Sequence, residues 1–208
     1  MRILISAGPT RERIDPVRFI SNRSTGKMGY ALAEKAKELG HDVVLISGPV
    51  SLTPVDGVKT VYVESAKDMA MEMKKYAEES EVIISCAAVA DYTPKVVADE
   101  KIKKGGDSLT IELIRTEDIL ATLGENKQAG QLLVGFAAET FDLINNANKK
   151  LLKKNLDWII ANDVKRDDIG FGSNENAVTM ISKTGEQIAI EKSTKKEIAF
   201  KILTNILK

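Results

Sequence analysis

Cysteine and histidine are scarce in this chain of 208 residues, which contains one of each. A single cysteine excludes an intramolecular disulfide and makes the reducing cytoplasm the expected compartment. Zinc sites draw on several cysteine or histidine ligands, so a zinc site is not expected. The chain also has no net charge at neutral pH, because its 30 Lys and Arg balance its 30 Asp and Glu. We therefore expect no nucleic acid and no membrane as partners, and any anion-binding site must be local.

Long apolar runs are absent too, since no segment approaches the roughly 20 residues of a membrane-spanning helix. The apolar opening of the chain is too short for a signal peptide and has no small-residue cleavage site. The remaining composition is typical of globular proteins, with 43% hydrophobic and 29% charged residues. A chain of this length fits one domain with a sizeable core, and we predict a single domain over residues 1–208.

Short apolar runs alternate with helical patterns along the chain. Strands are expected at about 2–7, 42–47, 58–63, 82–86, 109–114, 132–136 and 158–161, and helices at about 27–39, 66–78, 118–123, 141–154 and 194–207. Runs 178–182 and 187–190 flank a polar turn and predict a C-terminal β-hairpin. The alternation implies an α/β fold, with a doubly wound, mostly parallel sheet and helices on both faces. Ligands of such folds bind beyond the carboxyl ends of the strands, so the loops there are candidate sites.

The loop between the first strand and the first helix is rich in hydrogen-bond donors. Arg18 and Lys27 accompany Gly26 and Gly29, which permit close approach of a ligand to the backbone. A helix N-terminus after such a loop can bind an anion. The loop is not a P-loop, since Met28 stands where Ser or Thr is needed, and the chain has no Gly-x-Gly-x-x-Gly fingerprint. A capped helix after a solvated loop is the alternative.

A second candidate loop follows the most apolar strand and begins with small residues, Cys86, Ala87 and Ala88. Small residues let a flat ligand lie against the backbone, whose polar groups can then read its edge. Asp91 follows where a carboxylate can bind magnesium or a ligand hydroxyl, or where it simply caps a tight junction. Cys86 is expected to be structural, because the lone His41 precedes a strand and so lies at the opposite edge of the sheet.

Residues 88–106 have no clear period and carry several lysines, which predicts a long active-site flap. A mobile flap can bring a lysine to a phosphate and exclude water, although a charge run is also the pattern of an ordinary solvated surface. Later loops add Phe136, which can stack on a base or belong to the core. Lys150 and Lys154 share one helix face, where they can bind a ligand or stabilise the helix C-terminus.

Nine stretches form a series that spans nearly the whole chain: AGPTRE (7–12), DPVRFISN (15–22), STGKMG (24–29), SGPV (47–50), AAVADY (87–92), KIKK (101–104), GFAAET (135–140), KNLD (154–157) and NDV (162–164). This series resembles phosphopantothenoylcysteine synthetase, the synthetase domain of the bacterial bifunctional coenzyme A enzyme. The resemblance implies a Rossmann-like fold, a homodimer and a ligase that joins 4′-phosphopantothenate to L-cysteine. It also implies CTP as co-substrate and Mg²⁺ or Mn²⁺ carried mainly by the triphosphate, with metal ligands unknown.

The resemblance assigns roles to particular residues of this sequence. Asn22 and Lys101 are implied as catalytic, the first beside the acyl group and the second on the flap against the triphosphate. Arg18, Asn22 and Ala88 are implied as contacts of the phosphopantothenate. The implied nucleotide contacts are Ser85, Cys86, Ala87, Asp91, Lys101, Thr116, Glu117, Asp118, Ile119, Phe136, Lys150 and Lys154. The stretch 115–118 reads Arg-Thr-Glu-Asp where relatives commonly have Lys-Asn-Pro-Asp, so this sequence departs from the family pattern there.

The flavin-dependent decarboxylase half of the bifunctional enzyme is missing from this sequence. We expect no flavin, and a decarboxylase partner that is either a separate protein or fused to this domain. Two other classes compete with the ligase. A dinucleotide oxidoreductase would need the glycine fingerprint, and its failure to bind NAD(P) would exclude it. A non-catalytic nucleotide-binding module on the same fold would bind CTP without turnover.

Overall fold

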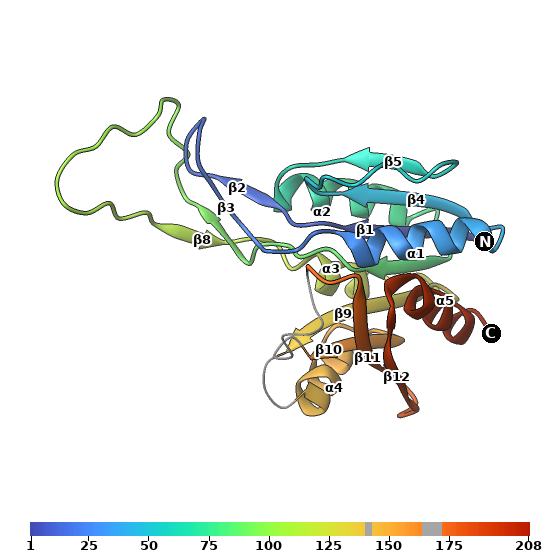
Figure 1. The fold of residues 1–208 in the computed structure, drawn as a ribbon. Coiled ribbons are helices and arrows are strands. Elements are labelled where there is room, and N and C mark those ends of the chain that lie inside the picture. Colours follow the sequence, from blue (N-terminus) through green and yellow to red (C-terminus); the bar gives the residue numbers. More distant parts are fainter. Residues whose placement is uncertain (140–142, 164–171) are drawn as a thin grey trace.

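The protein is described by a computed structural model over residues 1–139, 143–163 and 172–208. In this part of the chain, one eight-stranded sheet has the order β12-β11-β10-β9-β6-β1-β4-β5 (Figure 1). Pairing is parallel from β10 through to β5, and the last two strands join antiparallel. The strands are β1 (Arg2–Ala7), β4 (Asp42–Ser47), β5 (Lys59–Tyr62), β6 (Val82–Ser85), β9 (Leu132–Glu139), β10 (Trp158–Asp163), β11 (Glu175–Ser182) and β12 (Gln187–Thr194).

Helices cover both faces of this sheet and make two separate cores. On one face lie α1 (Lys27–Glu38) and α5 (Lys195–Ile206), which pack on each other and on the strands beneath them. The other face is covered by α2 (Ala66–Ala77), α3 (Ile119–Glu125) and α4 (Leu143–Lys153). The predicted fold class, doubly wound and mostly parallel with a C-terminal β-hairpin, is confirmed. Within the described residues, no helix is long and apolar enough to cross a membrane.

The central position of β6 follows from its sequence. Val82, Ile83 and Ile84 are at most 3% exposed, because a strand between two helical layers must be apolar on both faces. Its neighbour β1 is approached closely by α1. A Cβ atom on Gly29 would lie 2.5 Å from the Cβ atom of Ala7, so only glycine lets the helix approach this closely. The start of α1 is therefore brought to the carboxyl end of β1.

Two small antiparallel sheets project beyond the carboxyl ends of the main strands (Figure 1). One pairs β2 (Arg11–Arg13) with β3 (Phe19–Ser21), inside the loop that we expected to be irregular. The other pairs β7 (Tyr92–Pro94) with β8 (Leu113–Arg115). We call these two sheets and residues 95–112 between β7 and β8 the arm.

The expected strand at 109–114 was wrong as a member of the parallel sheet. Only Leu113–Arg115 is extended there, and it pairs with β7 in the arm. The physical reason is exposure: Leu113 is 40% exposed and Ile114 is 45% exposed, so no second layer covers this strand. The other expected elements are confirmed with shifts of a few residues at their ends, and residues 141–142 of the expected helix 141–154 lie outside the described residues.

Candidate functional site

A cavity of about 130 Å³ lies at the carboxyl ends of β6, β9 and β10, beside the start of α1. In the sheet order, β1 leads toward β5 on one side and β6 leads toward β10 on the other, so the chain reverses direction here. This reversal is where doubly wound sheets bind ligands. The residues that line the cavity are Ser24, Thr25, Gly26, Lys27, Met28, Gly29, Cys86, Ala87, Ala88, Phe136, Ala137, Asn162, Asn176 and Lys195.

The N-terminus of α1 opens toward this cavity without a protein cap. Its N-cap, Gly26, has a φ of 76° and makes no side-chain cap hydrogen bond, and its first turn carries no acidic residue. By contrast, α2 begins with a complete capping box between Ser65 and Asp68. The first amide groups of a helix need partners, and a phosphate can satisfy several of them at once. The start of α1 therefore has the form of an anion site.

Side chains from β1 and its following loop hold the end of β6 in place. Ser6 is 1% exposed, and its Oγ accepts hydrogen bonds from the amides of Cys86 and Ala87, both at 3.2 Å. Thr10 Oγ1 accepts from the amide of Ala90 at 3.0 Å. The predicted contact residue Ser85 is the last residue of β6, immediately before this segment. Sequence reasoning missed Ser6 and Thr10, because their partners lie 80 residues away along the chain.

Asn22 and Ala88, both implied as substrate contacts, are brought together. Asn22 Nδ2 donates to the carbonyl oxygen of Ala88 at 2.9 Å, and the amide of Thr10 donates to the same oxygen at 3.3 Å. The amide of Ala88 in turn donates to the carbonyl oxygen of Gly8 at 2.9 Å. Ala88 lines the cavity, so the exposed Asn22 side chain is held at its edge.

Arg18 is held by a buried carboxylate that also binds the base of the predicted flap. Asp15 is 1% exposed, and its carboxylate accepts from Arg18 Nε at 3.0 Å, and from the amides of Val17 at 2.9 Å and Ile102 at 3.1 Å. Hydrogen bonding to Arg18 holds the pKa of the Asp15 carboxyl well below its usual range. Arg18 also donates to the carbonyl oxygen of Ile102 at 3.2 Å. Lys101 itself is exposed, next to this anchored residue.

The predicted nucleotide contacts Thr116, Glu117, Asp118 and Ile119 are not among the residues that line this cavity. Thr116 Oγ1 donates to the carbonyl oxygen of Ala90 at 2.6 Å, which supports the loop after β6. Glu117 instead pairs with Lys74 of α2 at 2.8 Å, and this hydrogen bond lowers the pKa of its carboxyl. Ile119 is 5% exposed and belongs to the core beneath α3. The exposed Asp91 accepts the amide of Thr116 at its backbone oxygen.

Asp118 and Lys154 are brought together although 36 residues separate them. Lys154 Nζ lies 2.9 Å from Asp118 Oδ1, which also caps the start of α3. Burial raises the pKa of the Asp118 carboxyl, but the bonds from Lys154 and the amide of Ala121 outweigh this effect and lower it. Lys150 lies one turn earlier on α4, on the same helix face and exposed, as the spacing predicted.

The far wall of the cavity comes from β9 and β10. Phe136 lines it and packs against the α1–α5 core, and stacking of this ring on a base stays a prediction. Asn162 Oδ1 is buried at the cavity and accepts no hydrogen bond within the described residues. A buried acceptor without a donor costs free energy unless a ligand or water supplies one. Its neighbour in sequence, Asp163, has a side chain that lies outside the described residues.

Cys86 lines the cavity but has the properties of a structural thiol. Burial raises the pKa of the Cys86 thiol to about 12, so the reactive thiolate is scarce at neutral pH. His41 lies at the amino end of β4, where its amide donates to the carbonyl oxygen of Ala36. The cavity is at the carboxyl ends, so no Cys–His pair forms.

Two lysines from opposite ends of the chain meet at the cavity. Lys195, the first residue of α5, is 7% exposed, and its Nζ donates to the carbonyl oxygen of Ser173 at 2.7 Å. Lys27 Nζ donates to the carbonyl oxygen of Gly172 at 3.0 Å and to Asn174 Oδ1 at 2.8 Å. Sequence reasoning missed Lys195, because the pattern of its surroundings is that of an ordinary amphipathic helix.

Comparison with known proteins gives one family for the whole chain. The family described as "DNA/pantothenate metabolism flavoprotein C-terminal domain" matches residues 1–208.

The chain belongs to this family.

The chain is 52% identical to the Coenzyme A biosynthesis bifunctional protein CoaBC of Bacillus subtilis over 205 residues, which are 98% of this chain and 50% of that protein. The CoaBC of Escherichia coli is 45% identical over 191 residues, 90% of this chain and 47% of that protein. The chain thus spans about half the length of the curated relatives it matches.

Solved structures agree with the fold. The C-terminal domain of a CoaBC protein superposes with a TM-score of 0.85 at 51% identity, covering 99% of this chain and 93% of that one. The DNA/pantothenate metabolism flavoprotein of Streptococcus pneumoniae has a TM-score of 0.83 at 27% identity, covering 100% and 98%. A Cab2 mutant in complex with phosphopantothenate-cysteine has a TM-score of 0.81 at 17% identity, covering 99% and 85%, and shows the shared fold alone.

Proposed function

We propose that this protein is a phosphopantothenate–cysteine ligase, which joins 4′-phosphopantothenate to L-cysteine with CTP as the activating nucleotide. The observation that carries the proposal is the meeting of Asn22 and Ala88, 2.9 Å apart, at the edge of a cavity that the uncapped N-terminus of α1 opens into. The side-chain amide of Asn22, which can serve an acyl group, thus lies at the same cavity as the N-terminus of α1, which can serve phosphates. The relatives named as coenzyme A biosynthesis proteins support the same pathway.

The reaction proceeds in two displacements. First, a carboxylate oxygen of phosphopantothenate attacks the α-phosphorus of CTP, and pyrophosphate leaves. Second, the amine of cysteine attacks the activated acyl carbon, an amide bond forms, and CMP leaves with the loss of one proton from the amine. A carboxylate is a poor acyl donor, and the mixed anhydride must be protected from water between the two steps. The predicted flap over residues 88–106 carries Lys101, and we assign this protection to it.

Each predicted residue has a distinct task in this scheme. Asn22 polarises the acyl carbonyl while cysteine attacks, because its amide donates to an oxygen on which negative charge develops. Lys101 stabilises the triphosphate while the first bond forms. Arg18, held by Asp15 beside the base of the flap, contacts phosphopantothenate. The structure adds Asn162, whose Oδ1 has no hydrogen-bond donor in the described residues, and we assign it a hydrogen bond from the nucleotide.

Magnesium enters this scheme with the triphosphate. Within the described residues there is no group of three His, Cys, Asp or Glu side chains arranged to hold a metal ion. Mg²⁺ typically binds substrate phosphates with only one or two carboxylates, and Mn²⁺ can replace it. The ion would neutralise negative charge on the phosphates. Flavin has no role in the proposed reaction.

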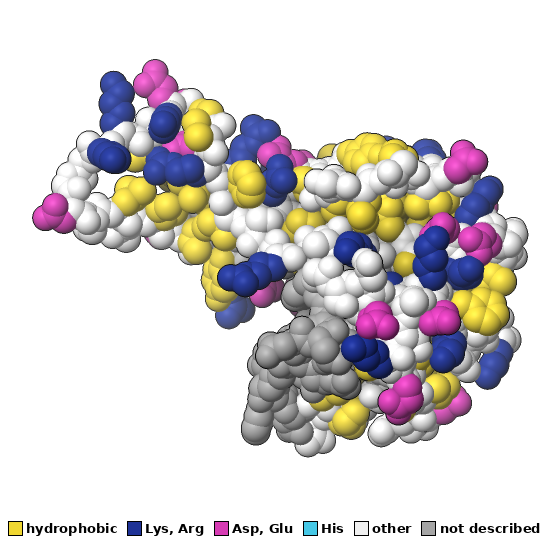
Figure 2. Space-filling model, viewed as in Figure 1, with side chains coloured by type: hydrophobic (Ala, Val, Ile, Leu, Met, Phe, Trp, Pro, Cys, Tyr) yellow, Lys and Arg dark blue, Asp and Glu magenta, His cyan; other side chains and the backbone are white. Residues whose placement is uncertain are grey.

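We propose a homodimer, which the arm supports. The arm bears large apolar side chains that are at least 40% exposed, and Figure 2 shows hydrophobic atoms gathered on this projecting part. A surface of this kind marks an interaction site, and a second copy of the chain is the proposed occupant. These residues are Val17, Phe19, Tyr92, Val96, Val97, Leu109, Leu113 and Ile114. Sedimentation should give twice the chain mass of 22.7 kDa, whereas a single-chain mass would contradict the dimer.

The remaining partners follow from the relatives. Because this chain corresponds to about half of each CoaBC protein, we propose that a phosphopantothenoylcysteine decarboxylase acts on its product, either fused to it or as a separate protein. The proposed compartment is the cytoplasm, and the proposed ligands are small molecules rather than nucleic acid or membrane.

The decisive assay is pyrophosphate release from purified protein with magnesium, CTP and 4′-phosphopantothenate, with and without cysteine. Release that becomes catalytic only with cysteine, with CMP as co-product, is the expected result. Release with ATP but not with CTP would keep the reaction and reverse the choice of base. Silence with both nucleotides would leave a nucleotide-binding module without this activity.

Two variants assign the steps. Asn22→Asp should still form the acyl-cytidylate but transfer it slowly to cysteine, because the amide donor is replaced by an acceptor. Lys101→Gln should fail before the intermediate forms. Single-turnover analysis with labelled CTP distinguishes these outcomes, and a block of both variants at the same step would contradict the assigned roles.

A further inference from the structure

The turn that joins β2 to β3 is closed by one oxygen of the Asp15 carboxylate. This atom, Oδ1, accepts the amides of Val17 at 2.9 Å and Arg18 at 2.8 Å. The carbonyl oxygen of Arg18 accepts the amide of Ile14 at 2.8 Å across the same turn. Asp15 is buried, although its neighbours Val17 and Phe19 are exposed. The other carboxylate oxygen is therefore free for a second task.

That second oxygen binds the backbone of the flap. Asp15 Oδ2 accepts the amide of Ile102 at 3.1 Å, and it also accepts Arg18 Nε at 3.0 Å and Nη2 at 2.5 Å. Arg18 Nη2 donates in turn to the carbonyl oxygen of Ile102 at 3.2 Å, so both backbone polar groups of Ile102 are held. The amide of Ala98 adds a link to the carbonyl oxygen of Ile14 at 3.0 Å. Figure 1 shows the β2–β3 turn beside the segment between β7 and β8.

We propose that Asp15 is a positioning residue of the ligase reaction, which fixes Lys101 through the backbone of Ile102 and fixes Arg18 through its guanidinium. The inference rests on the proposed function, in which Lys101 serves the triphosphate and Arg18 serves phosphopantothenate. Lys101 directly precedes the anchored residue, whereas residues 103–111, all described, make no hydrogen bond. A group held in its reacting geometry loses less entropy in the transition state. One buried carboxylate thus orients contacts for two substrates.

The negative charge of Asp15 is essential to this anchor. Hydrogen bonds to an ionised acceptor are the stronger ones, and hydrogen bonding to Arg18 keeps the pKa of the Asp15 carboxyl well below its usual range. An asparagine would keep one oxygen for the turn, but its amino group would face donors from Ile102 and Arg18. Asp15→Asn should therefore keep the turn closed and release both Ile102 and Arg18.

The kinetic test measures the two displacements separately, in single turnovers of the full chain. Asp15→Asn should slow formation of the acyl-cytidylate about 10-fold, the effect of losing a charge-assisted hydrogen bond. The steady-state KM for phosphopantothenate should rise as well. Transfer to cysteine should be nearly unchanged, because Asn22 is held by Ala88 and not by Asp15. A purely structural role would slow both displacements alike.

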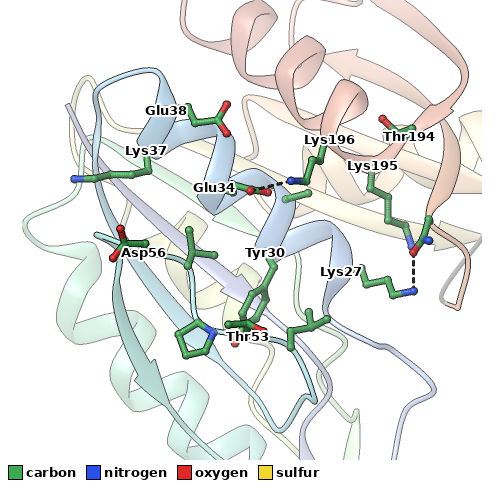
Figure 3. A pocket seen from close by; sticks show the side chains of 15 residues that line it. Lys27, Tyr30, Glu34, Lys37, Glu38, Thr53, Asp56, Thr194, Lys195 and Lys196 are labelled. Carbon is green, nitrogen blue, oxygen red and sulfur yellow. Dashed lines mark hydrogen bonds and ion pairs between the residues drawn. The ribbon is translucent and has the colours of Figure 1, made fainter.

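Two other carboxylates provide matched controls. Glu112 pairs with Lys95 at 2.8 Å within the arm, and its side chain is 68% exposed. Glu34 pairs with Lys196 at 2.9 Å, between α1 and α5 and outside the arm (Figure 3). Glu112→Gln and Glu34→Gln each remove an ion pair as Asp15→Asn does, and both should keep the parent rates of both displacements.

Tryptic cleavage measures the anchor without any substrate. The bond between Lys101 and Ile102 contains the amide that Asp15 binds, whereas the bond after Lys104 lies in the stretch without hydrogen bonds. Proteases cut segments that open locally, so cleavage of the parent protein should occur after Lys104 before it occurs after Lys101. Asp15→Asn should accelerate cleavage after Lys101 and leave cleavage after Lys104 unchanged, as mass spectrometry of the early peptides shows.

Should Asp15→Asn fail to fold, Ile102→Pro tests the same bond from the flap. Proline has no amide hydrogen to donate, while Asp15 and the turn stay intact. Lys103→Pro is its control, since the amide of Lys103 makes no hydrogen bond within the described residues. Ile102→Pro should slow acyl-cytidylate formation, and Lys103→Pro should not.

The outcomes separate this inference from the proposed function. Parent-like acyl-cytidylate formation in Asp15→Asn, equal slowing of both displacements, or unchanged cleavage after Lys101 would overturn the inference while the ligase proposal stands. Absence of pyrophosphate release by the parent protein with either nucleotide would overturn the ligase proposal itself, and the positioning role with it.

Discussion

Two lysine clusters at opposite ends of the sheet differ in whether a carboxylate stands among the described residues that form them. At the amino ends of β9 and β10, Asp157 is 5% exposed and accepts from Lys127 at 3.0 Å, Lys183 at 2.5 Å and the amide of Leu133 at 2.8 Å. At the carboxyl ends, Lys27 and Lys195 meet with no carboxylate among the described cavity residues. The three bonds of the Asp157 carboxylate are all internal to the protein, whereas Lys27 and Lys195 line a cavity.

The two clusters distinguish a buried charge that stabilises the fold from charges that line a cavity. Asp157 ties together the loop before β9, the start of β10 and the C-terminal hairpin, so all of its bonds are internal. Lys27 donates to the carbonyl oxygen of Gly172 and to Asn174 Oδ1, and Lys195 donates to the carbonyl oxygen of Ser173. A phosphate would accept stronger, charge-assisted hydrogen bonds from such ammonium groups. Changes in the first cluster should therefore alter stability, and changes in the second should alter affinity.

The largest effect on stability is expected from Asp157→Ala. Removing the acid leaves the buried Lys127 ammonium without its charge partner, which should cost about 3 kcal/mol of unfolding free energy. Urea unfolding measures it. Asp42→Ala is the control, because Asp42 pairs with Arg2 at the surface and should cost less than about 1 kcal/mol. Equal losses in the two variants would mean that the buried cluster has no special role.

The next largest effect is expected from Lys127→Met, which removes one of the two lysines that pair with Asp157. The Lys127 side chain is 12% exposed, and its loss leaves Asp157 with one charged partner fewer, at a cost of about 2 kcal/mol. Lys183→Met should cost less, because that side chain is 61% exposed. A larger loss of unfolding free energy for Lys183→Met than for Lys127→Met in urea would show that exposure does not govern the strength of these bonds.

Lys195→Met should change the unfolding free energy by less than about 1 kcal/mol, because its lost hydrogen bond is offset by removal of an unfavourably buried charge. This is the direct contrast with Lys127→Met. A loss as large as that of Lys127→Met would mean that Lys195 is structural, and the difference between the two clusters would disappear.

The smallest effect is the pH dependence of the two clusters. Burial opposes ionisation of Asp157, but bonds from Lys183, Leu133 and Lys127 outweigh it and lower its pKa. Its stabilisation is therefore present above the unfolded value of about 3.9 and is lost as pH falls through the folded value. Lys195 behaves differently: its folded pKa of about 8 lies below the unfolded value, so its destabilising contribution fades as pH rises toward about 10.4. The free energy of unfolding of the parent protein and of each variant, measured from pH 3 to 10, gives the pH dependence that each cluster contributes. Parallel curves of this free energy against pH would contradict the assignment.

Much of the fold was predictable because its signals are local. The apolar runs of β1, β4 and β6, and the helical periods of α2 and α5, were placed to within a few residues. The arm was not predicted, because strands of three residues carry too little pattern to be recognised. Segment 109–114 has an apolar period that suits a covered strand, yet no layer covers it.

The candidate site was predictable where it follows a strand in sequence. Gly26, Cys86 and Phe136 were expected near a ligand because the carboxyl ends of parallel strands meet at one edge, and all three line one cavity. Glu117 was expected there too, but Lys74 draws it to the surface of α2. Lys195 was not expected, since nothing local distinguishes it from the other lysines of α5. The ligand roles of all these residues stay predictions.

The sequence by itself determined the layered architecture and the family, because apolar period and motifs are local properties of the chain. Tertiary structure alone decided which polar groups meet. Asp15 with Ile102, Asn22 with Ala88, and Lys27 with residues 172–174 are pairs separated by 66 to 147 positions. Their approach depends on how the strands order in the sheet and how the helices pack on it, and the energy of a charge depends on whatever burial brings beside it.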